Sequence, residues 1–191
     1  MSIKFWVSFL FLLWYDKAII PRKGVFFAPP EEKMSKEKLY FPMFVDLSDK
    51  KVVVVGAGTI AKRRIRTLIE FTDHLVVIAP EVNKELKDLE AAGKLTILRK
   101  NYEREDIYDA ALVIAASNDK KVNQDIYSAC KCLGIQVNVC NDKNKCDFYF
   151  PSIITDENLV VGISASGKDH KKSKAVTEQI QELFEERSET H

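Results

Sequence analysis

The sequence predicts an α/β fold in which a parallel β-sheet is covered by helices on both faces. Residues 51–55 form a Val-rich run after Lys51, which is typical of a strand buried on both faces of a parallel sheet. A glycine-rich turn follows without a gap, and residues 62–71 then have the apolar spacing of a helix. The alternation of strand and helix repeats as far as Val139, which is the order that produces parallel strands.

The later elements follow from the same two kinds of pattern, short apolar runs for strands and longer amphipathic segments for helices. Asn118 or Asp119 is expected to cap the last helix of the sheet domain, and Gly134 to end it. The expected strands are residues 75–79, 95–98, 111–116 and 135–139, and the expected helices are residues 81–92 and 119–133.

Composition limits the classes of partner. The chain has 191 residues and a net charge of +1, so no broad electrostatic field favours nucleic acid as a partner. The four cysteines form no CxxC pair and have no histidine cluster beside them, so we expect no metal site and reduced thiols in a cytoplasmic protein. These cysteines are Cys130, Cys132, Cys140 and Cys146.

Residues 1–33 differ from the rest of the chain. The apolar run Phe5–Tyr15 is shorter than the roughly 20 residues that a spanning helix needs, and no small-residue cleavage site follows it. We interpret residues 1–33 as a non-native or dispensable extension before Met34 and expect no membrane association. A membrane anchor and a folded extension are the alternatives.

The glycine-rich turn predicts a dinucleotide site. It has the pattern G-x-G-x-x-A between a strand and a helix, the context in which this motif is informative. Gly56 permits the tight turn, Gly58 lets the backbone approach a pyrophosphate, and Ala61 allows close packing of helix on strand. The free N–H groups of the helix N-terminus then face the phosphates.

Ligands of such sheets bind beyond the carboxyl ends of the strands. Glu81 is the only carboxylate near the end of the second strand, and no arginine follows to hold a 2′-phosphate, which favours NAD over NADP. The residues expected to line the cofactor site are Gly56, Gly58, Thr59, Ile60, Pro80, Glu81, Ser117 and Asn118.

Motifs on either side of the sheet carry a resemblance to a known family. The segment P-M-F-V-D-L precedes the first strand, G-A-G-x-x-A-x-R-x-x-R surrounds the turn, and A-A-S-N-D with Asn123, V-N-V and D-F-Y-F-P-S-I-I follow. In combination they resemble the precorrin-2 dehydrogenase family, the N-terminal NAD-binding module of siroheme synthases, over roughly residues 39–184.

The resemblance implies NAD-dependent oxidation of the tetrapyrrole precorrin-2 to sirohydrochlorin. It also implies a Rossmann-like domain at residues 34–145, followed by a small β-hairpin and helix, residues 146–191, that builds a homodimer and contributes to the substrate site. Arg63 and Arg66 match the basic helix positions of the family, and we expect them and Lys168 to bind substrate carboxylates. An exposed helix face is the alternative for these cations.

One family position is altered. Where the bifunctional relatives have a catalytic aspartate, this chain has Asn141, and Asp142 comes next. An amide cannot accept a proton at neutral pH, so either Asp142 is the general base or the proton leaves to water. Asp142 could equally be a turn-forming residue.

Two other functions remain as alternatives. The first is sirohydrochlorin ferrochelatase, although the altered aspartate position and the absence of the family's further helical domain argue against iron insertion. The second is a non-enzymatic NAD-sensing domain, which leaves the segment D-F-Y-F-P-S-I-I unexplained.

Overall fold

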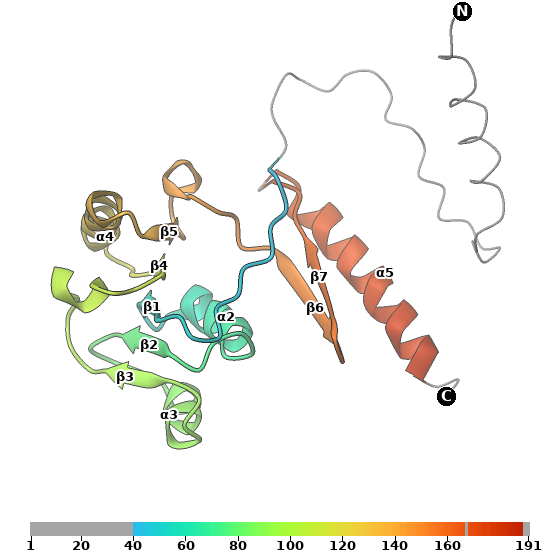
Figure 1. Ribbon diagram of the computed structural model, residues 1–191, viewed down its shortest axis with the longest axis horizontal. Coiled ribbons are helices and arrows are strands. Elements are labelled where there is room, and N and C mark those ends of the chain that lie inside the picture. Colours follow the sequence, from blue (N-terminus) through green and yellow to red (C-terminus); the bar gives the residue numbers. More distant parts are fainter. Residues whose placement is uncertain (1–39, 167, 189–191) are drawn as a thin grey trace, which may run out of the picture. The chain divides into compact units, whose positions relative to one another are not determined.

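The computed structural model describes residues 40–166 and 168–188, in which a five-stranded sheet is followed by a two-stranded hairpin and a helix (Figure 1). All pairs in the larger sheet are parallel, in the order β3-β2-β1-β4-β5, so the predicted fold class is confirmed. Residues 1–33, including the apolar run, lie outside the described residues. The strands of the larger sheet are β1 (Val52–Val55), β2 (Leu75–Ile78), β3 (Thr96–Leu98), β4 (Leu112–Ala115) and β5 (Gln136–Val139).

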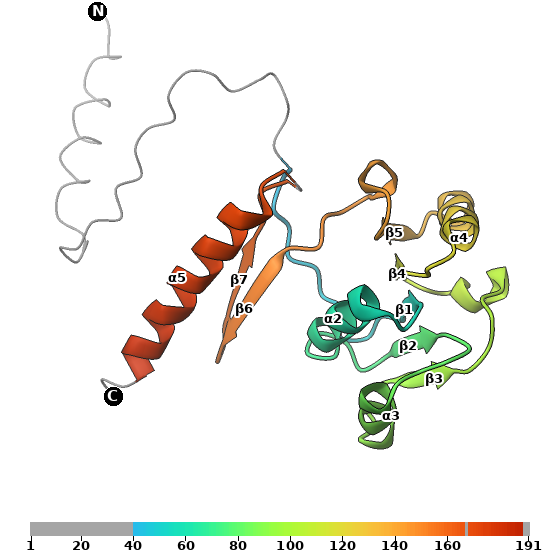
Figure 2. The ribbon, with the colours of Figure 1, turned by 180° about the vertical axis from the view of Figure 1, so that it is seen from behind.

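Helices cover both faces of the parallel sheet (Figures 1 and 2). Ile65 of α2 and Leu86 of α3 are fully buried against one face, and Ile126 of α4 is fully buried against the other. These apolar contacts supply most of the stabilisation, since burial of one such side chain contributes about 1.5–3 kcal/mol. The helices are α2 (Thr59–Leu68), α3 (Lys84–Ala91), α4 (Lys120–Leu133) and α5 (His170–Ser188), with short 3-10 helices η1 (Arg104–Ile107) and η2 (Lys143–Lys145).

Two helix starts differ from the prediction. Helix α2 begins at Thr59 rather than at residue 62, because Gly58 is already the N-cap and its carbonyl accepts from the N–H of Lys62 at 2.9 Å. Helix α3 begins at Lys84 rather than at residue 81, because the side chain of Asn83 caps it. For α4 the prediction is confirmed, with Asp119 as N-cap and Gly134 in the left-handed conformation at the C-cap.

After β5 the chain adds no crossover helix but a linker, residues 146–151. Phe148 and Phe150 pack into the core on the α2 face of the sheet, together with Ile114 of β4. The buried Asn138 of β5 holds the linker, because its Nδ2 donates to the carbonyl of Phe148 at 2.9 Å. Asp147 also pairs through its backbone N–H with the carbonyl of Val137 at 2.9 Å. The linker therefore adds two aromatic side chains to the cover that α2 and α3 provide on this face.

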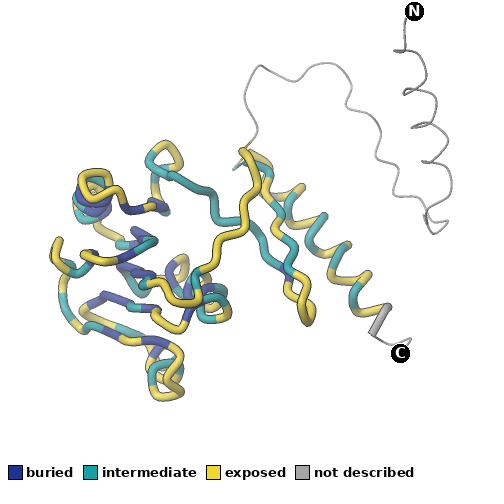
Figure 3. Tube along the Cα trace, in the orientation of Figure 1, coloured by how far each residue is buried: buried dark blue, intermediate teal, exposed yellow. Residues whose placement is uncertain are grey.

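The linker leads into the antiparallel hairpin of β6 (Ser152–Asp156) and β7 (Leu159–Ile163), against which α5 packs. An isolated two-stranded hairpin is marginally stable in water, so the contact with α5 is needed. The buried residues gather in the parallel sheet and its helices, whereas the hairpin and α5 are mainly half-buried or exposed (Figure 3). Within residues 40–166 and 168–188, every helix is too short or too polar to cross a membrane.

Candidate dinucleotide site

The turn after β1 requires glycine at its first position. Gly56 has φ +114°, and a Cβ there would lie 2.4 Å from the carbonyl oxygen of Ala116, the residue that follows β4. The N–H of Gly56 donates to the carbonyl of Ile78 at 2.8 Å, and the N–H of Ala116 donates to that of Val55 at 2.9 Å. The turn is thus fixed between β2 and β4, at the point where the order of the strands reverses.

Gly58 is in a different situation, because the protein itself does not require a glycine there. Its φ is −72°, and the nearest atom to a Cβ would be Oδ1 of Asn118 at 3.8 Å, an ordinary van der Waals contact. Gly58 is the N-cap of α2, so Thr59 and Ile60 form its first turn, and Ile60 is exposed. The space over Gly58, beside unpaired N–H groups of a helix end, fits a dinucleotide pyrophosphate.

The other expected cofactor residues lie at the same carboxyl edge of the sheet. Pro80 and Glu81 follow β2 and are both exposed, in the loop before α3. Ser117 and Asn118 follow β4, where Ser117 is half-buried and its Oγ accepts from the N–H of Asp119 at 3.1 Å. The individual contacts of these residues with the cofactor stay a prediction.

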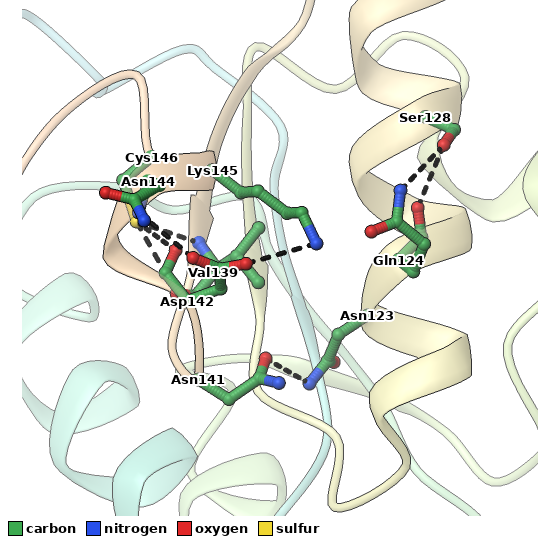
Figure 4. Close-up of polar contacts among 9 residues, drawn as sticks. All are labelled: Asn123, Gln124, Ser128, Val139, Asn141, Asp142, Asn144, Lys145 and Cys146. Atoms are coloured by element: carbon green, nitrogen blue, oxygen red, sulfur yellow. Dashed lines mark hydrogen bonds and ion pairs between the residues drawn. The ribbon is translucent and has the colours of Figure 1, made fainter.

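Asn123 connects two of the loops at this edge. It lies on α4 and is 1% exposed. Its Nδ2 donates to the carbonyl of Ser117 and to Oδ1 of Asn141, both at 2.9 Å, and its Oδ1 accepts from the N–H of Ser117 at 3.0 Å. Figure 4 shows the side chains of Asn123 and Asn141 directed toward one another. Asn123 therefore holds both the loop after β4 and the side chain that follows β5.

Sequence reasoning quoted Asn123 in a motif but gave it no role. A signal for one was available, because Asn123 stands in helical register with the buried Ile126 and Cys130. An amide on the apolar face of a helix needs internal hydrogen-bond partners, and the nearby strand ends are where they are found.

The carboxylate of Asp142 is engaged in contacts within the turn that follows β5. It accepts from the N–H of Asn144 at 3.1 Å and forms an ion pair with Lys145, also at 3.1 Å (Figure 4). The Lys145 side chain, helped by the Asn144 N–H, lowers the pKa of the Asp142 carboxyl. These contacts favour the turn-forming interpretation, since a carboxylate whose pKa is lowered is a weaker base, and general-base catalysis is most efficient when the pKa lies near the operating pH. A catalytic role for Asp142 stays a prediction.

The three expected substrate cations have different surroundings. Arg63 is exposed on α2, whereas Nε of Arg66 donates to Glu85 of α3 at 2.5 Å. Lys168 is exposed in the turn between β7 and α5, and its backbone N–H donates to the carbonyl of Ala165 at 3.0 Å. Binding of substrate by these three side chains stays a prediction. Sequence reasoning overlooked a fourth cation, the half-buried Arg64, because the register of a helix does not show which part of its flank a later segment covers.

The four cysteines are free thiols, and burial raises the pKa of Cys130 to about 12. Among the described residues, no three of His, Cys, Asp or Glu gather as ligands of a metal ion would.

A parallel sheet with this order, a glycine turn at the point of strand reversal and an open helix N-terminus beside it define a dinucleotide-binding protein. The chain belongs to the putative NAD(P)-binding family, whose model matches residues 43–152.

Known relatives are longer proteins. The chain is 40% identical over 144 residues to the probable multifunctional siroheme biosynthesis protein HemA of Ruminiclostridium josui, which covers 75% of this chain and 28% of that protein. It is 37% identical over 145 residues to the siroheme synthase of Buchnera aphidicola subsp. Acyrthosiphon pisum, covering 76% of this chain and 31% of that protein. The chain thus spans about a third or less of these relatives.

Among solved structures, the chain is similar to "SirC, precorrin-2 dehydrogenase". The TM-score is 0.68 at 28% sequence identity, and the match covers 76% of this chain and 71% of that one. A match of this extent is longer than the 43–152 segment of the family model.

Proposed function

We propose that the chain is an NAD-dependent precorrin-2 dehydrogenase that produces sirohydrochlorin in siroheme biosynthesis. The observation that carries the proposal is the likeness to a structure named precorrin-2 dehydrogenase, which extends over 76% of the chain. In the balanced reaction, precorrin-2 and NAD⁺ give sirohydrochlorin, NADH and one proton.

The residues present fit the cofactor. Gly56 and Gly58 shape the turn, and the first turn of α2 with Thr59 and Ile60 offers N–H groups to the pyrophosphate. Pro80 and Glu81, in the loop that follows β2, are the residues that we propose to face the ribose. Ser117 and Asn118 complete the site after β4. When bound, NAD supplies the acceptor for the hydride, and the protein supplies orientation and the route for the proton.

The proton that the substrate loses in addition to the hydride needs an acceptor. Asn141 is exposed beyond β5 with its amide oxygen held by Asn123, so it can orient a polar group but cannot take up a proton. Because Asp142 is held by Lys145 and its pKa is lowered, we propose that the proton passes to water. The alternative, Asp142 as general base, makes a different kinetic prediction, given below.

We also propose a cytoplasmic homodimer. The segment before β1 exposes a contiguous apolar stretch, in which Phe41 is 88% and Phe44 is 75% exposed. Stretches of this kind in a globular protein mark surfaces that a partner covers. Residues 146–191 supply the rest of this surface in our proposal, because the hairpin has only two strands in the part of the chain that the structure describes. The double variant Phe41→Asp/Phe44→Asp should sediment as a monomer; if it and the wild type sediment alike as dimers, this surface is not the interface.

The function is tested by anaerobic absorbance of the purified protein mixed with precorrin-2. Appearance of NADH, dependent on NAD and stoichiometric with sirohydrochlorin, is the expected result. A spectral change that requires iron and not NAD would identify a ferrochelatase instead. NAD binding without any conversion would identify an NAD-sensing domain.

A further inference from the structure

Arg64 is a half-buried cation on the flank of α2. Its guanidinium carbon lies 4.0 Å from the centroid of the Phe150 ring, and its Nη1 donates to the carbonyl of Phe150 at 3.5 Å. Its Nε is buried and has no hydrogen-bond partner. One long hydrogen bond to a carbonyl, one aromatic face and the thiol of Cys140 are weak compensation for the hydration that a guanidinium loses on burial.

No carboxylate compensates the charge of Arg64 within the described residues, although three other arginines have such a partner. Arg66 pairs with Glu85, Arg99 with Glu90, and Arg104 with Asp125. Only Arg63, exposed beside Arg64 on α2, also lacks one among the arginine side chains that the structure describes. Arg64 is the single member of this group that is both partly buried and without an acid.

The groups that face Arg64 do not supply a negative charge. They are the cation Arg63 and the thiols of Cys140 and Cys146. Burial raises the pKa of both thiols, so both are neutral at physiological pH, and burial lowers the pKa of the Arg64 guanidinium without discharging it. A partly desolvated cation surrounded by neutral and positive groups is an attractive site for an anion.

The position of Arg64 indicates which anion. Cys140 is the first residue after β5 and is followed by Asn141, which stands where the bifunctional relatives have a catalytic aspartate. Phe150 belongs to the linker, which Asn138 anchors through Phe148. The side chain of Arg64 thus reaches from α2, the helix that begins at the cofactor turn, to the linker that leads to the hairpin. The proposed substrate carries carboxylates on its periphery, and a guanidinium matches the planar geometry of a carboxylate.

We infer that Arg64 binds a peripheral carboxylate of the tetrapyrrole and so fixes the substrate at the junction of the parallel sheet and the linker. This inference rests on the proposed function. It adds a binding residue that neither the motif pattern nor the comparisons assign, and it makes Phe150 the platform that orients the guanidinium.

The test compares binding of sirohydrochlorin with binding of its fully methylated ester, followed by absorbance titration. Arg64→Met keeps much of the aliphatic packing on Phe150 but removes the charge. We expect it to weaken sirohydrochlorin binding roughly 10- to 100-fold while leaving ester binding and NAD affinity unchanged. Arg64→Lys, which keeps the charge but loses the planar fork, should give an intermediate loss. Arg104→Met is the matched control, because Arg104 is a surface arginine paired with Asp125, and it should change neither affinity.

The opposing outcomes are distinct. If Arg64 only fastens the linker, Arg64→Met will weaken acid and ester equally or will leave both unchanged, and either result overturns the inference. If Arg64→Met fails to fold, Arg64→Lys decides. The inference would likewise be overturned if Arg64→Lys bound sirohydrochlorin over its methyl ester with the same preference as the wild type and if this preference did not depend on salt concentration. If the wild-type protein itself neither binds sirohydrochlorin nor forms NADH from precorrin-2, the proposed function fails and the inference fails with it.

Discussion

Replacing Gly58 by alanine separates the needs of the cofactor from those of the fold. The added Cβ would meet only Oδ1 of Asn118, at 3.8 Å, and Gly58 already has a φ of −72° that any residue adopts. The folded protein should therefore accept Gly58→Ala, and the loss of backbone freedom in the unfolded chain should stabilise it by about 0.4–1 kcal/mol. NAD binding should not tolerate the added methyl group, because the pyrophosphate must approach the backbone at Gly58.

The expected loss in NAD affinity follows from the contacts that the methyl group displaces. Loss of one charge-assisted hydrogen bond to the pyrophosphate, worth about 1.5–3 kcal/mol, raises Kd roughly 10- to 100-fold. Isothermal titration calorimetry measures the affinity, and urea unfolding measures the stability. A Gly58→Ala protein that is folded and binds NAD with wild-type affinity would refute the assignment of this turn as the cofactor site.

Two other glycines provide controls. Gly56→Ala should prevent stable folding, because its Cβ would lie 2.4 Å from the backbone oxygen of Ala116. Gly134→Ala has open space around it but a φ of +71°, so it should lower the free energy of unfolding by about 1–2 kcal/mol and leave NAD affinity unchanged.

Three further predictions follow from the loops at the carboxyl edge and from the N-terminus. Asn123→Leu leaves polar groups of the loops after β4 and β5 unpaired, so urea titration should show a free energy of unfolding lower by about 2–4 kcal/mol; an unchanged value would mean that water replaces the amide. Asp142→Asn should keep near-normal turnover if Asp142 is a turn former, whereas loss of a general base would cut kcat roughly 10²–10⁴-fold and remove the basic limb of the pH–rate profile. Lys145 lowers the folded-state pKa of Asp142, so this ion pair stabilises the protein above the unfolded-state pKa of about 3.9. The stabilisation is lost as the pH falls from there through the lower folded-state pKa. Any difference in the free energy of unfolding between the wild type and Asp142→Asn should therefore vanish in acid. A chain that starts at Met34 should be soluble and fully active; failure to fold, or recovery of the native protein in the membrane fraction, would exclude the interpretation of residues 1–33 as dispensable.

The parallel sheet could be predicted because its signals are local. A run such as Val52–Val55, which is buried on both faces, shows no alternation of polar and apolar residues. A glycine-rich turn directly after such a strand is typical of a dinucleotide site. The helix ends were harder to predict from the sequence. Both Pro80 and Asn83 are residues that can precede the first turn of a helix, and the sequence does not show that Asn83 is the N-cap of α3.

The charge environment of α2 could not be predicted from the sequence. Arg63, Arg64 and Arg66 stand within four positions, and the motif singles out Arg63 and Arg66 but leaves Arg64 unassigned. The partner of Arg66 comes from another helix, and the ring over Arg64 comes from a residue 86 positions later. Helical periodicity places a side chain on a face, but only the tertiary fold determines whether that face meets an acid, an aromatic ring or water.

The linker also determines where this chain could be divided. Since Phe148 and Phe150 pack against the core on the α2 face of the sheet, a fragment that stops at residue 145 would leave part of this core open to water. Such a fragment should be protease-sensitive and should aggregate, although it contains every strand of the parallel sheet. A transplant or gene fusion that is to retain a working cofactor site must therefore carry the chain through Pro151. The linker is then an obligatory part of the parallel-sheet domain, whereas the hairpin that begins at Ser152 could be exchanged.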